Sequence, residues 1–306
     1  MADLMRALAR AMPWVFVLIW STGFVVARFG MPHAPPMGFL AMRYGLSAVC
    51  FGVWITLSGA RWPQGRAAWA HLAVSGASMH AGYLGGVWSA VKLGLGAGTV
   101  ALLVGLQPVL TALWITGSRS ASGIAVPAGS GAPVAHVSRQ QWVGLLLGLL
   151  GLTLVVWQKL GVGEVTPANL GLAMFALVSI TAGTLYQKRF VAPCDVRTAN
   201  TVQLLAAFIV TAPLALLEKE AFDWHPHLLG AMAWSVLVLT LGGSSLLYLL
   251  IQRGAATQVT SLLYLVPPCT ALLAWALFGE SFTPSMLFGM VLTVAGVALV
   301  VRASPR

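Results

Sequence analysis

The sequence predicts an all-α integral membrane protein in which ten transmembrane helices form two inverted five-helix repeats. Three observations lead to this fold class. Of the 306 residues, 58% are hydrophobic and only 8% are charged, and the mean hydropathy is +0.87, whereas about a quarter of the residues in soluble domains are charged. Apolar runs long enough to cross a bilayer recur along the whole chain. The two halves of the chain also resemble each other.

The internal repeat is clearest in a short apolar segment that occurs twice. Residues 106–113 read LQPVLTAL and residues 265–272 read LVPPCTAL, so two segments 159 residues apart agree at five of eight positions. Each copy has a proline at its third position. Paired proline-interrupted segments at matching positions are typical of secondary transporters with inverted repeats.

Two glycines recur as a second pair of markers. They lie at an offset of 145: Gly144 and Gly151 in the first half, and Gly289 and Gly296 in the second. The offset is shorter here because the first half contains an additional loop, residues 118–138, rich in Ala, Gly, Ser and Pro. We interpret this loop as a flexible linker. The predicted repeats are residues 1–158 and 159–306.

Turn residues and charges divide the apolar runs into the ten predicted helices. Each run approaches the roughly 20 residues that a bilayer core requires, and a helix satisfies its own backbone groups in lipid. Glycine-rich or charged turns at residues 94–98 and 253–255 separate neighbouring helices. In chain order, the predicted helices are residues 12–30, 36–58, 67–92, 97–117, 139–157, 166–188, 197–217, 228–252, 256–278 and 283–302.

The first predicted helix has an alternative interpretation as a signal peptide, because Arg6 and Arg10 precede an apolar run. The repeat argues against cleavage. Three residues of this helix have counterparts at an offset of 160: Ser21, Gly23 and Arg28 align with Thr181, Gly183 and Lys188. We therefore expect the segment to be retained as a helix.

The positive charges predict that both termini are cytoplasmic, because cytoplasmic loops retain Lys and Arg. The cytoplasmic set then has twelve members: Arg6, Arg10, Arg61, Arg66, Arg119, Arg139, Lys188, Arg189, Arg197, Arg253, Arg302 and Arg306. The opposite side has at most five: Lys92, Lys159, Lys219, Arg28 and Arg43. Five helices per repeat is an odd number, so the second repeat enters the membrane from the opposite side and the repeats are inverted.

Several ordered motifs resemble the EamA-type branch of the drug/metabolite transporter superfamily. They are Trp20-Ser21-Thr22-Gly23-Phe24, Arg43, the two Leu-x-Pro-x-x-Thr segments, and Phe278-Gly279-Glu280. The resemblance covers nearly the whole chain and implies export of small metabolites, often amino acids, across the bacterial inner membrane. The first half departs from the pattern, since Ser118-Arg119 stands where many relatives have Gly-Glu, and its loop is unusually long.

The expected function is export of small metabolites, most of all amino acids including aromatic and apolar ones, by alternating access. All seven acidic residues fall in loops or at helix ends, so no carboxylate is predicted at membrane depth. Proton-coupled pumps usually need a buried ionisable group, which favours facilitated diffusion or exchange. Histidine side chains in general titrate near physiological pH. His80 therefore leaves open an alternative function, a proton-coupled drug exporter that uses this histidine.

Polar and aromatic residues at helical spacing predict the substrate site. The candidate binding residues are Trp20, Arg43, His80, Tyr83, Trp88, Ser179, Tyr186, Ser244, Tyr248, Ser261 and Tyr264. The candidate hinge or gating residues are Pro108, Pro267 and Pro268. Aromatic faces attract an ammonium group, and Arg43 can hold a carboxylate. Hydrogen bonding between helices is the alternative for each Ser and Thr, and outward snorkelling is the alternative for Arg43.

Other classes of function fit the sequence less well. Gly242-Gly243-Ser244-Ser245 with His80 faintly resembles the serine and histidine of an intramembrane protease, but Ser245 replaces the second glycine of that motif. The Lys and Arg residues are scattered, which excludes a nucleic-acid surface. The three cysteines are far apart, so we expect neither disulfides nor a metal site. We expect no cofactor and no enzymatic activity, with a lipid bilayer and small solutes as partners, and a monomer, although a dimer is possible.

Overall fold

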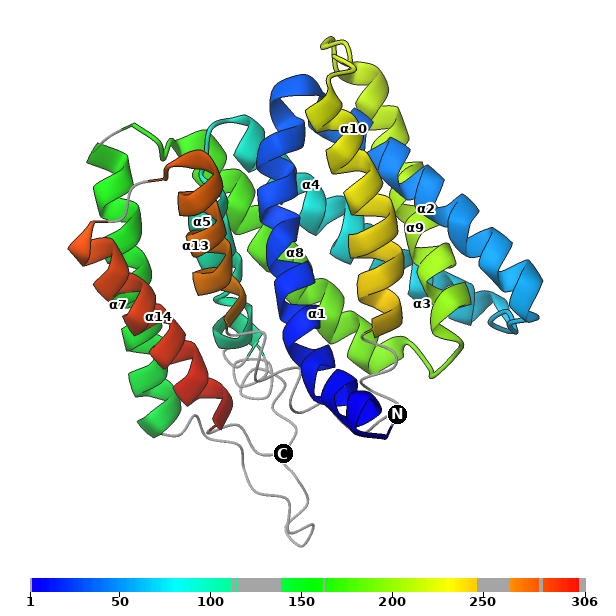
Figure 1. Ribbon diagram of the computed structural model, residues 1–306, viewed down its shortest axis with the longest axis horizontal. Coiled ribbons are helices and arrows are strands. Elements are labelled where there is room, and N and C mark those ends of the chain that lie inside the picture. The colour runs from blue at the N-terminus through cyan, green and yellow to red at the C-terminus, as the bar shows by residue number, and fades with distance from the viewer. Residues whose placement is uncertain are drawn as a thin grey trace, which may run out of the picture.

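The computed structural model describes residues 2–111, 114, 139–161, 163–246, 265–280 and 283–302, and all regular structure within these ranges is helical (Figure 1). Predictions made for the loop 118–138 and for Tyr248, Ser261 and Tyr264 fall outside the described residues.

A helix lies within each of the ten ranges that the sequence predicts. The first half begins with α1 (Ala2–Gly30), the short η1 (Met31–His33) and α2 (Pro36–Ser58). Three consecutive elements then form one continuous helical rod: α3 (Arg66–Gly76), η2 (Ala77–Gly82) and α4 (Tyr83–Lys92). The half ends with α5 (Ala97–Val104) and α7 (Arg139–Gly161). The second half contains α8 (Pro167–Phe190), α9 (Val196–Leu217), α10 (Pro226–Ala233) continued by η3 (Trp234–Gly242), α13 (Val266–Phe278) and α14 (Pro284–Arg302).

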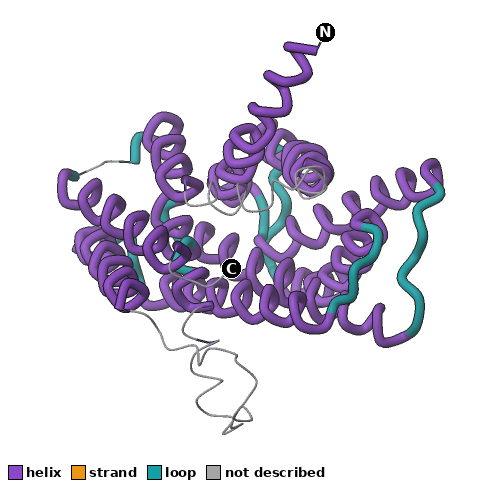
Figure 2. The backbone as a smooth tube through the Cα atoms, turned by 90° about the horizontal axis from the view of Figure 1, so that it is seen from below, coloured by secondary structure: helices purple, strands orange, loops and turns teal. Residues whose placement is uncertain are grey.

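Five of these helices are long and apolar enough to cross a membrane. They are residues 11–33, 36–58, 167–190, 196–217 and 226–246, and shorter apolar helices accompany them. Many large apolar side chains remain exposed, such as Leu216 at 87% and Leu57 at 82%. A surface of this kind requires an apolar solvent. Viewed from below in Figure 2, the N-terminal turns of α1 project beyond the body of the bundle.

The repeated glycines lie where α7 and α14 cross. A Cβ atom added to Gly151 would lie 2.3 Å from the carbonyl oxygen of Gly289, and one added to Gly296 would lie 2.4 Å from that of Gly144. The two backbones therefore touch. Since the residue number rises along one helix as it falls along the other, α7 and α14 are antiparallel.

The two proline segments also meet. A Cβ atom added to Gly98 of α5 would lie 3.2 Å from the Cα of Ala271, and one added to Gly105 would lie 2.9 Å from the Cγ of Pro267. Thus α5 packs antiparallel against α13, as α7 does against α14. In both pairs, each helix contacts the helix that occupies the same place in the other half of the sequence.

Two helical rods contain a π-helical segment, η2 in the third predicted helix and η3 in the eighth. These rods occupy corresponding places in the two halves. π-Helical turns are rare and frequently occur at functional sites. Residues His80 and Thr240 lie within them.

Five of the described acidic residues gather at one end of the bundle, where three of them cap helices, whereas Asp195 lies at the other end. Glu218 accepts hydrogen bonds from the backbone N–H groups of Met37 and Gly38 at 3.0 and 2.8 Å. At the start of α5, Glu164 accepts from Gly96 at 2.9 Å and Glu280 accepts from Ala97 at 3.1 Å. Carboxylates satisfy the free N–H groups and the positive dipole of a helix N-terminus. The buried Lys159 ammonium lies 2.6 Å from Glu164.

Candidate substrate site

Arg43 of α2 is the charged group at the centre of the candidate site. It is 8% exposed, and its Nη2 and Nε atoms donate to the hydroxyl of Thr240 at 3.2 and 3.4 Å. Its guanidinium carbon lies 6.0 Å from the centre of the Trp88 ring, within the range of a cation–π contact. None of the six acids whose side chains the structure describes pairs with it. The outward snorkelling considered for Arg43 is wrong for this conformation, because the side chain is buried.

His80 lies beside Arg43 and is held by neighbouring tyrosine and glutamine side chains. The Tyr44 hydroxyl donates to the backbone carbonyl of His80 at 2.9 Å, and the two rings are 6.0 Å apart. The Gln203 side chain of α9 contacts the His80 imidazole. Tyr83, one turn further along the same rod, is buried. Three of the predicted site residues, Arg43, His80 and Tyr83, are thus brought together.

A hydrogen-bonded polar cluster, which the sequence analysis missed, continues from this centre. It consists of Ser75, Gln187 and Gln203, from α3, α8 and α9. Ser75 donates to the Gln187 carbonyl oxygen at 2.8 Å, while Gln203 donates to the same oxygen at 3.2 Å and to Ser75 at 3.3 Å. Buried polar groups that contact one another across three helices fix how those helices are rotated.

Apart from Trp88, which also contacts Arg43, the other predicted residues lie away from the Arg43 centre. Trp88 is 1% exposed and stacks on Phe39 with ring centres 4.4 Å apart. Ser179 donates to the backbone carbonyl of Ser78 at 3.0 Å, which is the interhelical bond proposed as its alternative. Tyr186 shares a 2.9 Å hydrogen bond with His71. Trp20 is 38% exposed.

A cavity of about 230 Å³ lies between α2, α9 and the residues after η3. Its lining consists of Phe51, Trp54, Val196, Arg197, Asn200, Ser244 and Ser245. The predicted Ser244 therefore faces a cavity. Asn200 also lines the cavity, and its side-chain nitrogen is buried without a hydrogen-bond partner among the described residues.

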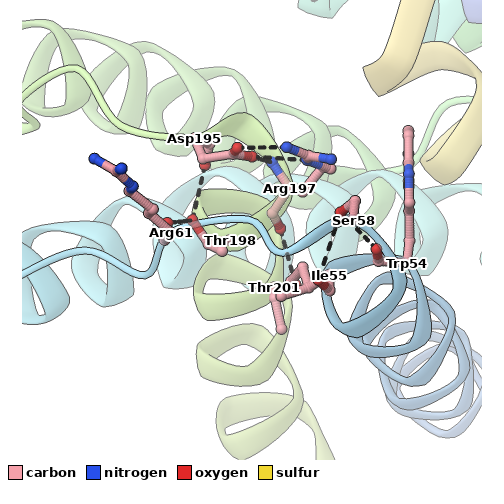
Figure 3. Close-up of polar contacts among 8 residues, drawn as sticks. All are labelled: Trp54, Ile55, Ser58, Arg61, Asp195, Arg197, Thr198 and Thr201. Atoms are coloured by element: carbon pink, nitrogen blue, oxygen red, sulfur yellow. Dashed lines mark hydrogen bonds and ion pairs between the residues drawn. The ribbon is translucent and has the colours of Figure 1, made fainter.

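Polar contacts beside this cavity join the start of α9 to the end of α2 and the segment that follows it (Figure 3). Asp195 begins α9 and accepts two hydrogen bonds from the Arg197 side chain, at 3.0 and 2.7 Å. These bonds lower the pKa of the Asp195 carboxyl. Arg197 also lies 5.8 Å from the Trp54 ring, and the backbone of Arg61 accepts from Thr198 at 3.1 Å.

Pro108 follows a break in the fourth predicted helix. α5 ends at Val104, a turn follows, and helix resumes at Gln107. Proline has no N–H and its ring excludes the carbonyl four residues earlier, which here belongs to Val104. Pro267 and Pro268 occupy the first turn of α13, where a missing N–H costs nothing. The break before Pro108 is as predicted, whereas the hinge role of the three prolines stays a prediction.

Comparison with known proteins identifies the family. Residues 169–302 match the EamA-like transporter family. A probable amino-acid metabolite efflux pump of Salmonella typhimurium is 22% identical, with 92% of this chain and 90% of the relative aligned. The uncharacterized transporter YwfM of Bacillus subtilis is 28% identical over 95% of this chain and 94% of its own. The second half of the chain therefore matches the EamA-like transporter family, and the relatives aligned over the whole chain are named as transporters.

A solved crystal structure has a similar fold. It superposes with a TM-score of 0.63 over 96% of this chain and 98% of the other, at 18% identity. The long apolar helices and the match to a transporter family indicate a multi-pass membrane protein. Members of the family are transporters and not enzymes, so the protease reading of Ser244 and His80 is wrong. Ser245 instead donates to the backbone carbonyl of Leu241 at 2.5 Å.

Proposed function

We propose that this transporter exports amino acids, including apolar and aromatic ones, and that Arg43 binds their carboxylate. The supporting observation is a buried guanidinium that has a hydroxyl partner, Thr240, and no carboxylate among the described residues. Burying a charge without an opposite charge is costly. A substrate carboxylate would supply the missing charge through bidentate hydrogen bonds, which guanidinium groups form well.

The groups around Arg43 suit an α-amino acid with an apolar side chain. Trp88 and Tyr83 present aromatic surface next to the guanidinium. The hydrogen-bonding groups of His80 and Gln203 lie beside the guanidinium and are the proposed partners of the ammonium. The polar cluster of Ser75, Gln187 and Gln203 extends from this centre toward the end of the bundle with Arg61 and Asp195. We propose that this end is cytoplasmic and that the 230 Å³ cavity forms part of the entry path.

Alternating access requires two halves that can exchange their roles. We propose ten transmembrane helices in two inverted repeats, residues 1–158 and 159–306. The antiparallel pairing of α7 with α14 and of α5 with α13 supports this arrangement, because an in-plane twofold axis makes equivalent helices antiparallel. The matched π-helical segments in the two rods support it too. Pro108, Pro267 and Pro268 are the proposed hinges.

A panel of labelled amino acids in proteoliposomes tests the proposed function. Purified protein should exchange internal and external threonine, methionine or phenylalanine. Exchange without a pH gradient would support transport that is not coupled to protons, whereas strict dependence on the gradient would favour the proton-coupled alternative that uses His80. No movement of any amino acid would overturn the proposed substrate class.

Cysteine labelling should place the two ends of the bundle on opposite sides of the bacterial inner membrane. We expect Arg66→Cys to react with a thiol reagent only from the cytoplasm and Lys219→Cys only from outside, since both side chains are exposed and lie at opposite ends. The background for both variants has Cys50, Cys194 and Cys269 replaced by serine. Labelling of both positions from one side would contradict the inverted topology.

His80→Ala should lower amino-acid exchange several-fold while the protein still folds. Tyr44 donates to the backbone carbonyl of His80 rather than to its ring, so the substitution leaves this interhelical bond in place. Exchange is measured in proteoliposomes, and elution on size exclusion reports folding. If exchange equals that of the unsubstituted protein, His80 does not belong to the site.

A further inference from the structure

Three histidines meet at the end of the bundle that carries the capping acids. His33 lies in η1, His225 caps the start of α10, and His227 lies in the first turn of that helix. One ring nitrogen from each histidine lies within 4.8 Å of the others. The ring centres of His33 and His225 are 4.3 Å apart, and those of His225 and His227 are 4.6 Å apart. His33 is distant in sequence from the neighbouring His225 and His227, so only the fold brings it to them.

Asp223 orients the first of these imidazoles. Its Oδ2 atom lies 2.7 Å from Nδ1 of His33. A carboxylate only accepts hydrogen bonds, so this contact favours the tautomer in which Nδ1 carries the proton and Nε2 keeps a free lone pair. A carboxylate behind a histidine is the usual outer support of a metal-binding imidazole.

The two loops that carry the histidines are fixed to each other. The backbone N–H of Asp223 donates to the carbonyl of His33 at 2.9 Å. Lys92 donates to the carbonyls of Met31 and Ala34, at 2.8 and 3.3 Å, and pairs with Glu220. A site supported in this way holds its ligands near a productive geometry.

We propose that His33, His225 and His227 bind one divalent transition-metal ion, with Zn²⁺ the best match, and that Asp223 positions His33 for this role. Imidazole nitrogen suits Zn²⁺, Cu²⁺ and Ni²⁺, whereas Ca²⁺ and Mg²⁺ prefer oxygen ligands. Three histidines and a water molecule make a tetrahedral zinc site. This metal site is separate from the substrate site at Arg43.

Coordination needs a small movement of the rings. Ligand nitrogens around tetrahedral Zn²⁺ are about 3.4 Å apart. The rings of His33 and His225 are nearly parallel, at 5°, and a metal ion lies in the plane of the imidazole that binds it. The His225 ring therefore has to turn and to give up the 3.2 Å hydrogen bond from the backbone N–H of His227. The bound ion would then link the end of α1 to the start of α10 and stabilise this conformation.

Isothermal titration with ZnCl₂, in detergent and without substrate, tests the site independently of transport. The protein must be purified through a tag that contains no histidine. We expect one Zn²⁺ per chain with a dissociation constant near the micromolar range, a higher melting temperature with Zn²⁺, and no binding of Ca²⁺. His33→Ala and His227→Ala should each weaken binding at least tenfold, and Asp223→Asn by about tenfold.

The matched control is His71→Ala, which removes a histidine at the other end of the bundle and should leave Zn²⁺ binding unchanged. His227 is exposed, so His227→Ala is not expected to disturb folding even if His33→Ala does. The absence of saturable Zn²⁺ binding would overturn the proposal, and so would binding that His227→Ala leaves at full strength.

Discussion

Arg43→Ala is expected to lower amino-acid exchange at least about 30-fold, because removing one partner of a buried charge pair costs 2 kcal/mol or more. Arg43→Lys should give an intermediate rate, since an ammonium keeps the charge but cannot form the paired hydrogen bonds of a guanidinium. The rates are measured in proteoliposomes with labelled phenylalanine. Competition by phenylalaninamide, which lacks the carboxylate, reports whether the loss concerns that group.

The specificity readout separates a binding role from a structural role for Arg43. The unsubstituted protein should prefer phenylalanine to its amide, and Arg43→Ala should lose this preference. Arg61→Ala is the matched control, because this arginine is exposed in the segment after α2 and its side chain is not part of the site. An Arg43→Ala protein that still discriminates against the amide would refute the carboxylate role.

The sequence predicts the helices well because each one depends on local signals. Apolar runs predicted where helices lie, and Pro108 predicted the break after Val104 because a missing N–H acts on its own helix. The π-helical segments η2 and η3 were not predicted. In an α-helix each backbone N–H bonds to the carbonyl four residues earlier, and in a π-helix to the carbonyl five residues earlier. Packing against neighbouring helices, which the local sequence does not reveal, decides between the two patterns.

The candidate site is less predictable because it depends on how the helices are rotated about their axes. Arg43 was predicted as a partner for a carboxylate, and His80 and Tyr83 were predicted from their shared helix face, and the fold brings the three together. Thr240 and Gln203 were missed, since a single Thr or Gln in an apolar run gives no sign of which neighbour it faces. The histidine cluster was missed for a related reason: His33 and the pair His225 and His227 come from distant parts of the sequence, and neither part alone supplies three ligands.

Gly151→Ala is expected to lower the melting temperature by about 2–10 °C. The added methyl group would lie 2.3 Å from the carbonyl oxygen of Gly289 and 2.6 Å from the backbone nitrogen of Thr293. These are backbone atoms, so the α7–α14 pair has to separate, and overpacking of this kind typically costs 1–3 kcal/mol. Small residues allow helices in lipid to approach closely, where dispersion between them is the main attraction. Unfolding in detergent, followed by tryptophan fluorescence, gives the melting temperature.

Gly171→Ala is the matched control for this substitution. Gly171 lies inside α8, and no atom lies within 4 Å of the position that its Cβ would occupy. The same methyl group there should leave the melting temperature unchanged or raise it slightly, since alanine favours helix over glycine by up to about 1 kcal/mol. Equal melting temperatures for the two variants would mean that α7 and α14 do not touch at this crossing. The antiparallel glycine pairs would then no longer support the inverted repeats. The antiparallel contact between α5 and α13 would be the remaining support for a twofold axis between the two halves.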